Sequence, residues 1–163
     1  MSTVPGDPVS TSALGGALRS HALRLAAAAE QLAGAARRPG RHGGPDSAVR
    51  ERELMTAAAE QLDRIGSLLQ SWATDVVEET ARVRGIAAES ARTDLRVEGH
   101  HVLEAPGPSR ADPLQRLEAR ERLQHLLNRV TAQDSRTRAR LQRELEASAT
   151  VLARMSRQAR GEP

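Results

Sequence analysis

Apolar residues recur along most of the chain at spacings of three and four, the period of one face of an α-helix. The first stripe consists of Leu14, Leu18, Ala22, Leu25, Ala29 and Leu32. Before it, Asp7-Pro8 combines an N-cap residue with a first-turn proline. The pattern predicts a helix over about residues 8–37, preceded by a flexible N-terminus over residues 1–6. Gly15-Gly16 in its early turns either allows another helix to approach closely or is simply tolerated.

A longer stripe follows a loop rich in glycine and proline at residues 38–45. It consists of Ala58, Leu62, Ile65, Leu69, Trp72, Val76, Glu79, Val83, Ile86 and Ser90. A heptad seam of this length indicates packing along another helix, here within a predicted helix at residues 46–92. We expect the exposed flank of this seam to bind a partner through Leu62, Ile65, Leu69, Trp72 and Val76.

The rest of the chain predicts a small β element and a third helix. Residues 95–104 alternate with a period near two around Gly99, which indicates a β-hairpin or an extended turn. A third apolar stripe predicts a helix over residues 112–160. We therefore expect one all-α domain over residues 1–163, a three-helix antiparallel bundle or coiled-coil hairpin with a small β-hairpin or extended turn.

The second and third predicted helices have nearly equal lengths, which favours an antiparallel hairpin. Their charges are complementary, because residues 46–99 hold eleven acids and seven arginines, whereas residues 110–160 hold six acids and twelve arginines. Folding the chain about residue 102 places Glu79 opposite His125, which would make a pH-sensitive pair. Alternatively, rotation of the helix exposes Glu79 to solvent.

Composition excludes several classes of chemistry. Trp72 is the only aromatic residue, so the core is built from small and aliphatic side chains. All 24 basic side chains are arginines, which is typical of a high-GC bacterium. The chain contains no cysteine, which excludes disulfides and thiolate chemistry. Neither a signal peptide nor an apolar run of about 20 residues is visible, so we expect no membrane span, and a protein that is cytoplasmic or secreted without a cleavable signal peptide.

Recognisable catalytic motifs are missing, and no Tyr, Lys or Cys is available as an acid, a base or a nucleophile. We expect no enzyme, no cofactor, no metal and no small-molecule substrate. An enzyme would need an unrecognised site built from Glu and His. His100-His101 with Glu104 could ligate a metal, but adjacent residues of an extended segment point to opposite sides.

A basic stripe marks the third predicted helix. Its members are Arg122, Arg129, Arg136 and Arg143 at seven-residue spacing, with Arg140 beside them. This stripe could contact the phosphates of a nucleic acid. It could equally be a solvated face, or a partner for the acidic second helix. No aromatic residues interleave with it for base stacking.

Three segments resemble the ESX-type helical proteins exported by type VII secretion. They are Leu14 to Arg19, Ala57 to Trp72, and Leu95-Arg96-Val97-Glu98-Gly99. The resemblance implies a helical hairpin that is exported as a folded dimer or serves as a targeting or partner domain, without catalysis. The chain departs from this family in two respects. It lacks the Trp-x-Gly turn between the first two helices, and it has no Tyr for the Tyr-x-x-x-[Asp/Glu] export signal.

These patterns favour a non-catalytic helical interaction protein, associated with type VII secretion as the resemblance implies. Its partner would be another helical protein or a second copy of the chain. The alternative is a basic coiled-coil protein that binds nucleic acid through the arginine stripe.

Overall fold

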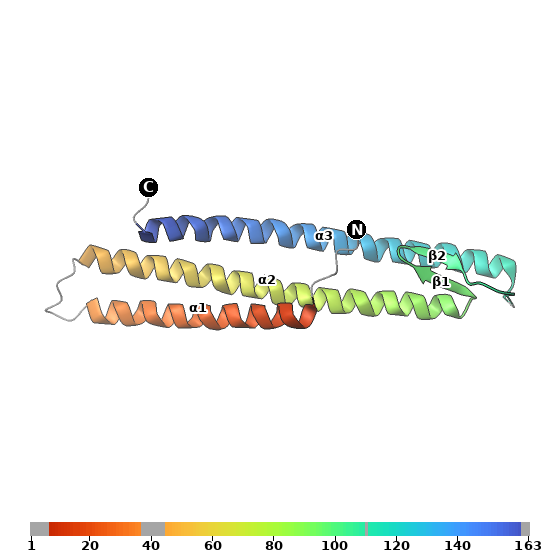
Figure 1. Ribbon diagram of the computed structural model, residues 1–163, viewed down its shortest axis with the longest axis horizontal. Helices are drawn as coiled ribbons and strands as arrows, with labels where there is room; N and C mark the ends of the chain where they lie inside the picture. The colour runs from red at the N-terminus through yellow and green to blue at the C-terminus, as the bar shows by residue number, and fades with distance from the viewer. Residues whose placement is uncertain (1–6, 37–44, 110, 161–163) are drawn as a thin grey trace. The chain divides into compact units, whose positions relative to one another are not determined.

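The computed structural model describes residues 7–36, 45–109 and 111–160. Figure 1 shows three long helices and one short hairpin. The elements are α1 (Pro8–Ala36), α2 (Pro45–Ala91), β1 (Leu95–Glu98), β2 (His101–Glu104) and α3 (Pro113–Arg160). The predicted all-α fold with a small β-hairpin is confirmed, and every predicted helix boundary lies within one residue of the observed one. The predicted flexible N-terminus and the predicted loop lie outside the described residues, except Pro45, which begins α2.

Two of the helices begin at aspartate N-caps, as their sequences predict. The carboxylate of Asp7 accepts hydrogen bonds from the backbone N–H of Val9 at 3.2 Å and of Ser10 at 2.9 Å. A further bond from the Ser10 hydroxyl is the largest of the effects that lower the pKa of Asp7. Asp112 caps α3 in the same way through the backbone N–H of Leu114 at 3.3 Å. These bonds satisfy backbone donors that the first helical turn leaves without an intrahelical partner.

The chain forms two compact units. The first, named the α1 unit here, comprises residues 1–73 and 141–163, and the second, named the hairpin unit, comprises residues 74–140. The prediction of a single domain stays a prediction, and each unit is described by itself.

In the α1 unit, α1 packs against α2 through small residues spaced seven apart on both helices. They are Gly15, Ala22 and Ala29 on α1, and Ala59, Gly66 and Ala73 on α2, and all six are buried. A Cβ added to Gly66 would lie 2.6 Å from the carbonyl oxygen of Gly15 and 2.5 Å from the Cγ of Arg19. Because real Cβ atoms do not approach so closely, the two backbones meet at a distance that only glycine allows. Of the two explanations for Gly15, close helix approach is the one confirmed.

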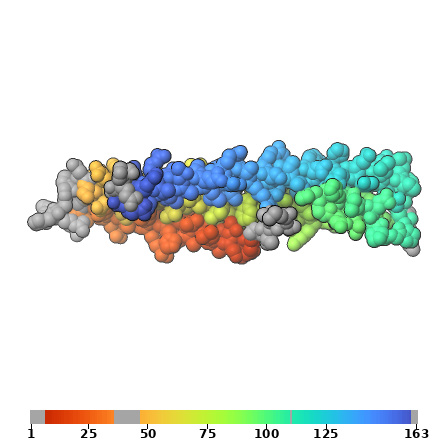
Figure 2. Space-filling view, turned by 45° about the horizontal axis from the view of Figure 1, so that its top comes forward, coloured from red at the N-terminus to blue at the C-terminus, as the bar shows by residue number. Residues whose placement is uncertain are grey.

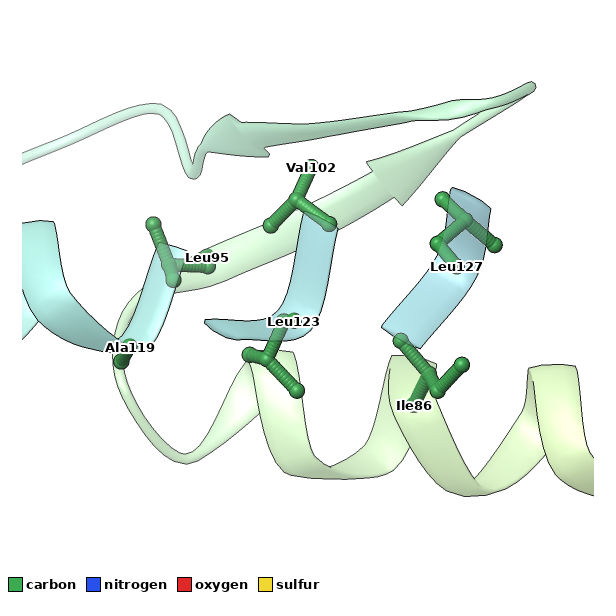
Figure 3. Close-up of a cluster of buried hydrophobic side chains, with 6 residues drawn as sticks. All are labelled: Ile86, Leu95, Val102, Ala119, Leu123 and Leu127. Atoms are coloured by element: carbon green, nitrogen blue, oxygen red, sulfur yellow. The ribbon is translucent and has the colours of Figure 1, made fainter. Parts of the chain in front are cut away.

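The hairpin unit is built around larger aliphatic side chains. Figure 3 shows Leu95 and Val102, from β1 and β2, pointing toward Ala119 and Leu123 of α3, with Ile86 of α2 close by. Leu123 is completely buried, at 0% exposure. Gly99 has a φ of 60°, and His100 is not in the left-handed region, which defines a two-residue type II′ turn.

The Gln124 side chain fastens the hairpin to α3. Its Oε1 accepts a hydrogen bond from the backbone N–H of Val102 at 2.8 Å, and its Nε2 donates to the carbonyl oxygen of His100 at 2.9 Å. This amide therefore satisfies backbone groups on the outer edge of β2, which would otherwise face solvent as an open sheet edge.

In the hairpin unit, Glu79 lies beside Asp134 and Glu89 beside Arg122, so α2 and α3 run antiparallel there. The pairs observed in each unit correct the predicted register. Folding about residue 102 would place Arg64 opposite Arg140 and Glu89 opposite Gln115. Instead, Arg64 pairs with Glu144 in the α1 unit, and Glu89 pairs with Arg122 in the hairpin unit. The observed partners lie four and seven residues later along α3. The reason is that the first turns of α3 lie beyond the end of α2, where Ala119 packs with Leu95 of the hairpin.

Candidate interaction surfaces

The α2 residues predicted to bind a partner do not form an exposed surface. Leu62, Ile65, Leu69 and Trp72 are each only partly exposed, and they lie in the α1 unit. Val76 lies in the hairpin unit and is buried, at 8% exposure. The seam residues are therefore partly covered by the chain itself. Whether the part that stays accessible contacts a partner remains a prediction.

Exposed large apolar side chains lie elsewhere among the described residues. They are Val9, Leu14 and Leu23 on α1, Val49 and Val77 on α2, and Leu114 and Leu117 on α3. Val9 and Leu23 are the most exposed of them, at 75% and 73%. Both belong to α1, whose position at the surface of the α1 unit is visible in Figure 2, coloured red to orange. The most exposed large apolar side chains therefore lie on α1 and not on the α2 seam.

We name the side of α1 that carries Val9 and Leu23 the outer face of α1. It consists of Val9, Ala13, Gly16, Ser20, Leu23 and Ala27, again at alternating spacings of four and three. Five of these residues are exposed and Gly16 is partly exposed. The face carries no charged side chain over five helical turns. The sequence analysis describes only the leucine-rich stripe from Leu14 to Leu32; the outer face has the same spacing of four and three, and this spacing is the signal that could have revealed it.

The contacts on the opposite side of α1 fix its orientation. Gly15 and Gly66 bring the two backbones together, as described above. Beside them, the Arg19 guanidinium donates to Asp63 Oδ1 at 3.0 Å and to Gln70 Oε1 at 3.1 Å. Because these contacts hold the small-residue side of α1 against α2, the outer face is held pointing away from α2.

Glu79 has a different neighbour from the one predicted. Its carboxyl lies beside that of Asp134 of α3, and not beside the predicted His125, because the register is shifted. Asp134 is held by the Arg138 Nε, which lies 2.8 Å from each carboxylate oxygen. Partial burial, followed by the neighbouring Asp134 carboxyl and its charge, raises the pKa of Glu79 to about 7, whereas Arg138 and Arg82 act to lower it. The Glu79 carboxyl therefore gains its negative charge only near neutral pH.

The arginine stripe is not uniform. Arg122 pairs with Glu89, and the Arg136 Nε donates to its own helix at the Ala132 carbonyl oxygen, at 3.1 Å. Arg140 also has a partner. Arg129 and Arg143 are exposed and make no ion pair or hydrogen bond within the described part of the chain. Arg143 lies in the α1 unit and the other four lie in the hairpin unit.

His100 lies in the hairpin turn and His101 in β2, and both are exposed. Across residues 7–36, 45–109 and 111–160, no three His, Asp or Glu side chains cluster closely enough to hold a metal ion. None of the helices in these ranges has the length and hydropathy needed to cross a bilayer.

Comparison of the chain with protein-family models, with curated proteins and with solved structures gives no match.

Proposed function

We propose that this protein is a non-catalytic helical interaction protein and that the outer face of α1 receives a helix of its partner. The observation that carries the proposal is the exposure of Val9 and Leu23 on a helix that is apolar on both sides. A surface helix normally has one apolar face toward the core and a charged face toward water. A helix that is apolar on both sides normally has both sides covered, and α1 has α2 on one side only.

The charge distribution among the helices supports this assignment. In sequence, α1 has only three Asp, Glu or Arg residues, whereas α2 has fourteen and α3 has sixteen. A strongly charged surface is typical of a solvated helix, and its absence at interface cores is typical of protein–protein contacts. The outer face of α1 therefore has the low charge that is typical of the core of a contact surface.

Labelling of single cysteines in cells tests this proposal. Because the chain contains no cysteine, a single introduced thiol reports on one position alone. Leu23→Cys places the thiol on the outer face, and His21→Cys places it on an exposed part of α1 rotated about 200° away. In cells that make the protein, we expect a polar maleimide to label Cys at position 23 several-fold more slowly than at position 21. Equal labelling rates would refute the proposal.

The association with type VII secretion rests on the sequence resemblance and is proposed on that ground alone. Nucleic-acid binding is the alternative function, supported by the exposed and unpaired guanidinium groups of Arg129 and Arg143. Binding of duplex DNA that weakens steeply with salt, and that is lost in an Arg129→Gln/Arg143→Gln variant, would favour this alternative. Absence of binding at physiological salt would remove it.

A further inference from the structure

We propose that the helix received by the outer face of α1 is α1 of a second copy of this chain, packed antiparallel to the first. This inference rests on the proposed function and goes further, because it names the partner and the residues that meet. It follows from how large and small side chains are distributed along the outer face.

In an antiparallel pair of identical helices related by a twofold axis, each residue of one helix faces a fixed residue of the other. The axis that matches the outer face to itself lies level with residue 18. Val9 then faces Ala27, Ala13 faces Leu23, and Gly16 faces Ser20. Each large side chain of one copy is therefore received by a small residue of the other, which is the arrangement that fills a helix seam without voids.

The other geometries fit less well. A parallel pair would place Val9 against Val9 and Leu23 against Leu23, and it would leave small residues facing small ones at the three positions between them. Such a seam would be too wide at its ends to close at its centre. The antiparallel arrangement is thus the one for which this face is self-complementary.

Charge favours a second copy over the chain's other helices as the occupant. An uncharged face desolvates charged groups without compensation, so its partner should also be uncharged. The outer face of α1 meets this requirement, and it carries Val9 and Leu23, the most exposed large apolar side chains among the described residues. In the antiparallel register the flanking Arg19 lies level with Ala17 of the partner copy, and Arg24 lies level with Ser12. The two copies of Arg19 lie on the same side of the seam near the axis, where the charge of each is offset by its ion pair with Asp63 at 3.0 Å.

The length of the contact sets the expected affinity. From Val9 to Ala27 the face is about 27 Å long. Two helices in contact over this length bury less surface than a standard stable interface of about 1,600 Å². We therefore expect a reversible dimer with a dissociation constant on the order of micromolar.

The test uses the full-length protein and measures mass by sedimentation equilibrium over a concentration range that spans micromolar. The wild type should pass from monomer to dimer as concentration rises. Ser20→Arg introduces a charge beside the axis and should leave a monomer. His21→Arg is the matched control, because it adds the same charge to α1 at an exposed position about 100° away. It should dimerise like the wild type.

Two further variants make the test sharper. Leu23→Gln should weaken the dimer at least tenfold without adding a charge. Gly16→Glu should also be monomeric, and a Cβ at this position meets only the Gln70 Nε2, at an ordinary 3.6 Å. Mixing Ser20→Arg with Gly16→Glu places Arg against Glu across the axis and should restore a dimer of one copy of each. Circular dichroism should show that every variant keeps the helix content of the wild type.

The outcomes separate this inference from the proposed function. A wild type that stays monomeric at all concentrations, or a Ser20→Arg variant that still dimerises, would overturn the homodimer. A mixture of the two charged variants that stays monomeric would overturn the antiparallel register. If the purified protein is monomeric but Cys at position 23 is protected in cells, the proposed function stands and the partner is another protein.

Discussion

The α1 unit and the hairpin unit are each stabilised internally, but by side chains of opposite size. In the α1 unit, glycine and alanine at seven-residue intervals let the helices approach until their backbones touch. In the hairpin unit, leucine, isoleucine and valine fill a wider space between two helices and a hairpin. The first arrangement requires residues with very small side chains, and the second requires residues with large aliphatic side chains. The α1 unit should therefore be sensitive to added atoms, and the hairpin unit to removed ones.

Truncation at the centre of the hairpin unit should have the largest effect. Leu123 is 0% exposed and belongs to the core cluster that the two helices and the hairpin share. Leu123→Ala removes buried methyl groups and leaves a cavity, so unfolding free energy should fall by about 3–4 kcal/mol. Urea denaturation, monitored by circular dichroism, measures this free energy of unfolding. Leu114→Ala on the same helix, at a residue 63% exposed, is the control and should cost under about 1 kcal/mol.

Adding one carbon to the α1 unit should have the next largest effect. Gly66→Ala puts a Cβ against the backbone of α1, and we expect a loss of about 2–3 kcal/mol despite the better helix propensity of alanine. Trp72 lies in the same unit and supplies the fluorescence signal. The matched control is Gly85→Ala on the same helix, where no heavy atom lies within 4 Å. The free energy of unfolding of that variant should rise by up to about 1 kcal/mol. A similar rise for Gly66→Ala would contradict the close approach of α1 and α2.

The next largest effect should be a dependence of folding stability on pH, and it should arise in the hairpin unit. The pKa of Glu79 is raised from 4.5 to about 7, so the folded state binds the extra proton between these values. The stabilisation is complete below the unfolded pKa and is lost as pH rises through 7, because the charged Glu79 is then partly buried and also repelled by Asp134. Solvent screening of this partly exposed pair reduces the loss to about 1–2 kcal/mol.

Thermal unfolding between pH 5 and pH 8.5 measures this slope. Glu79→Gln keeps a neutral side chain at every pH and should remove most of the dependence. Asp75→Asn, an exposed change on the same helix, should leave it intact. A Glu79→Gln variant with the slope of the wild type would show that another group is responsible.

The smallest expected effect is a gain in folding stability from a substitution in the α1 unit. The Ser148 hydroxyl is buried and has no hydrogen-bond partner among the described residues. Ser148→Ala removes this unpaired polar group from a helix and should add about 1 kcal/mol of stability. Ser90 in the hairpin unit is equally buried, but its hydroxyl donates to the Ile86 carbonyl oxygen at 2.9 Å. Ser90→Ala should therefore gain less than Ser148→Ala, and the reverse order in denaturation midpoints would refute this explanation.

The sequence predicts the helices well, because three-and-four spacing and aspartate caps are local signals. The hairpin could also be predicted, from Gly99 and the alternating residues around it. The register between α2 and α3 could not, because it depends on how the hairpin packs on Ala119, which is a contact between distant segments. The accessibility of the α2 seam could not be predicted either, for a related reason. Leu62 and Trp72 have the spacing of a seam, but spacing does not reveal whether the chain itself covers that seam.

The bond between Gln124 and the outer edge of β2 has a consequence for the order in which the protein assembles during synthesis. A two-stranded hairpin is marginally stable by itself. This one receives its apolar support from Leu123 and its edge hydrogen bonds from Gln124, both of which leave the ribosome after both strands. The α1–α2 seam, in contrast, is complete once Ala73 has been made. Translation should therefore release a paired α1 and α2 first, and the hairpin should become ordered only when the first turns of α3 emerge.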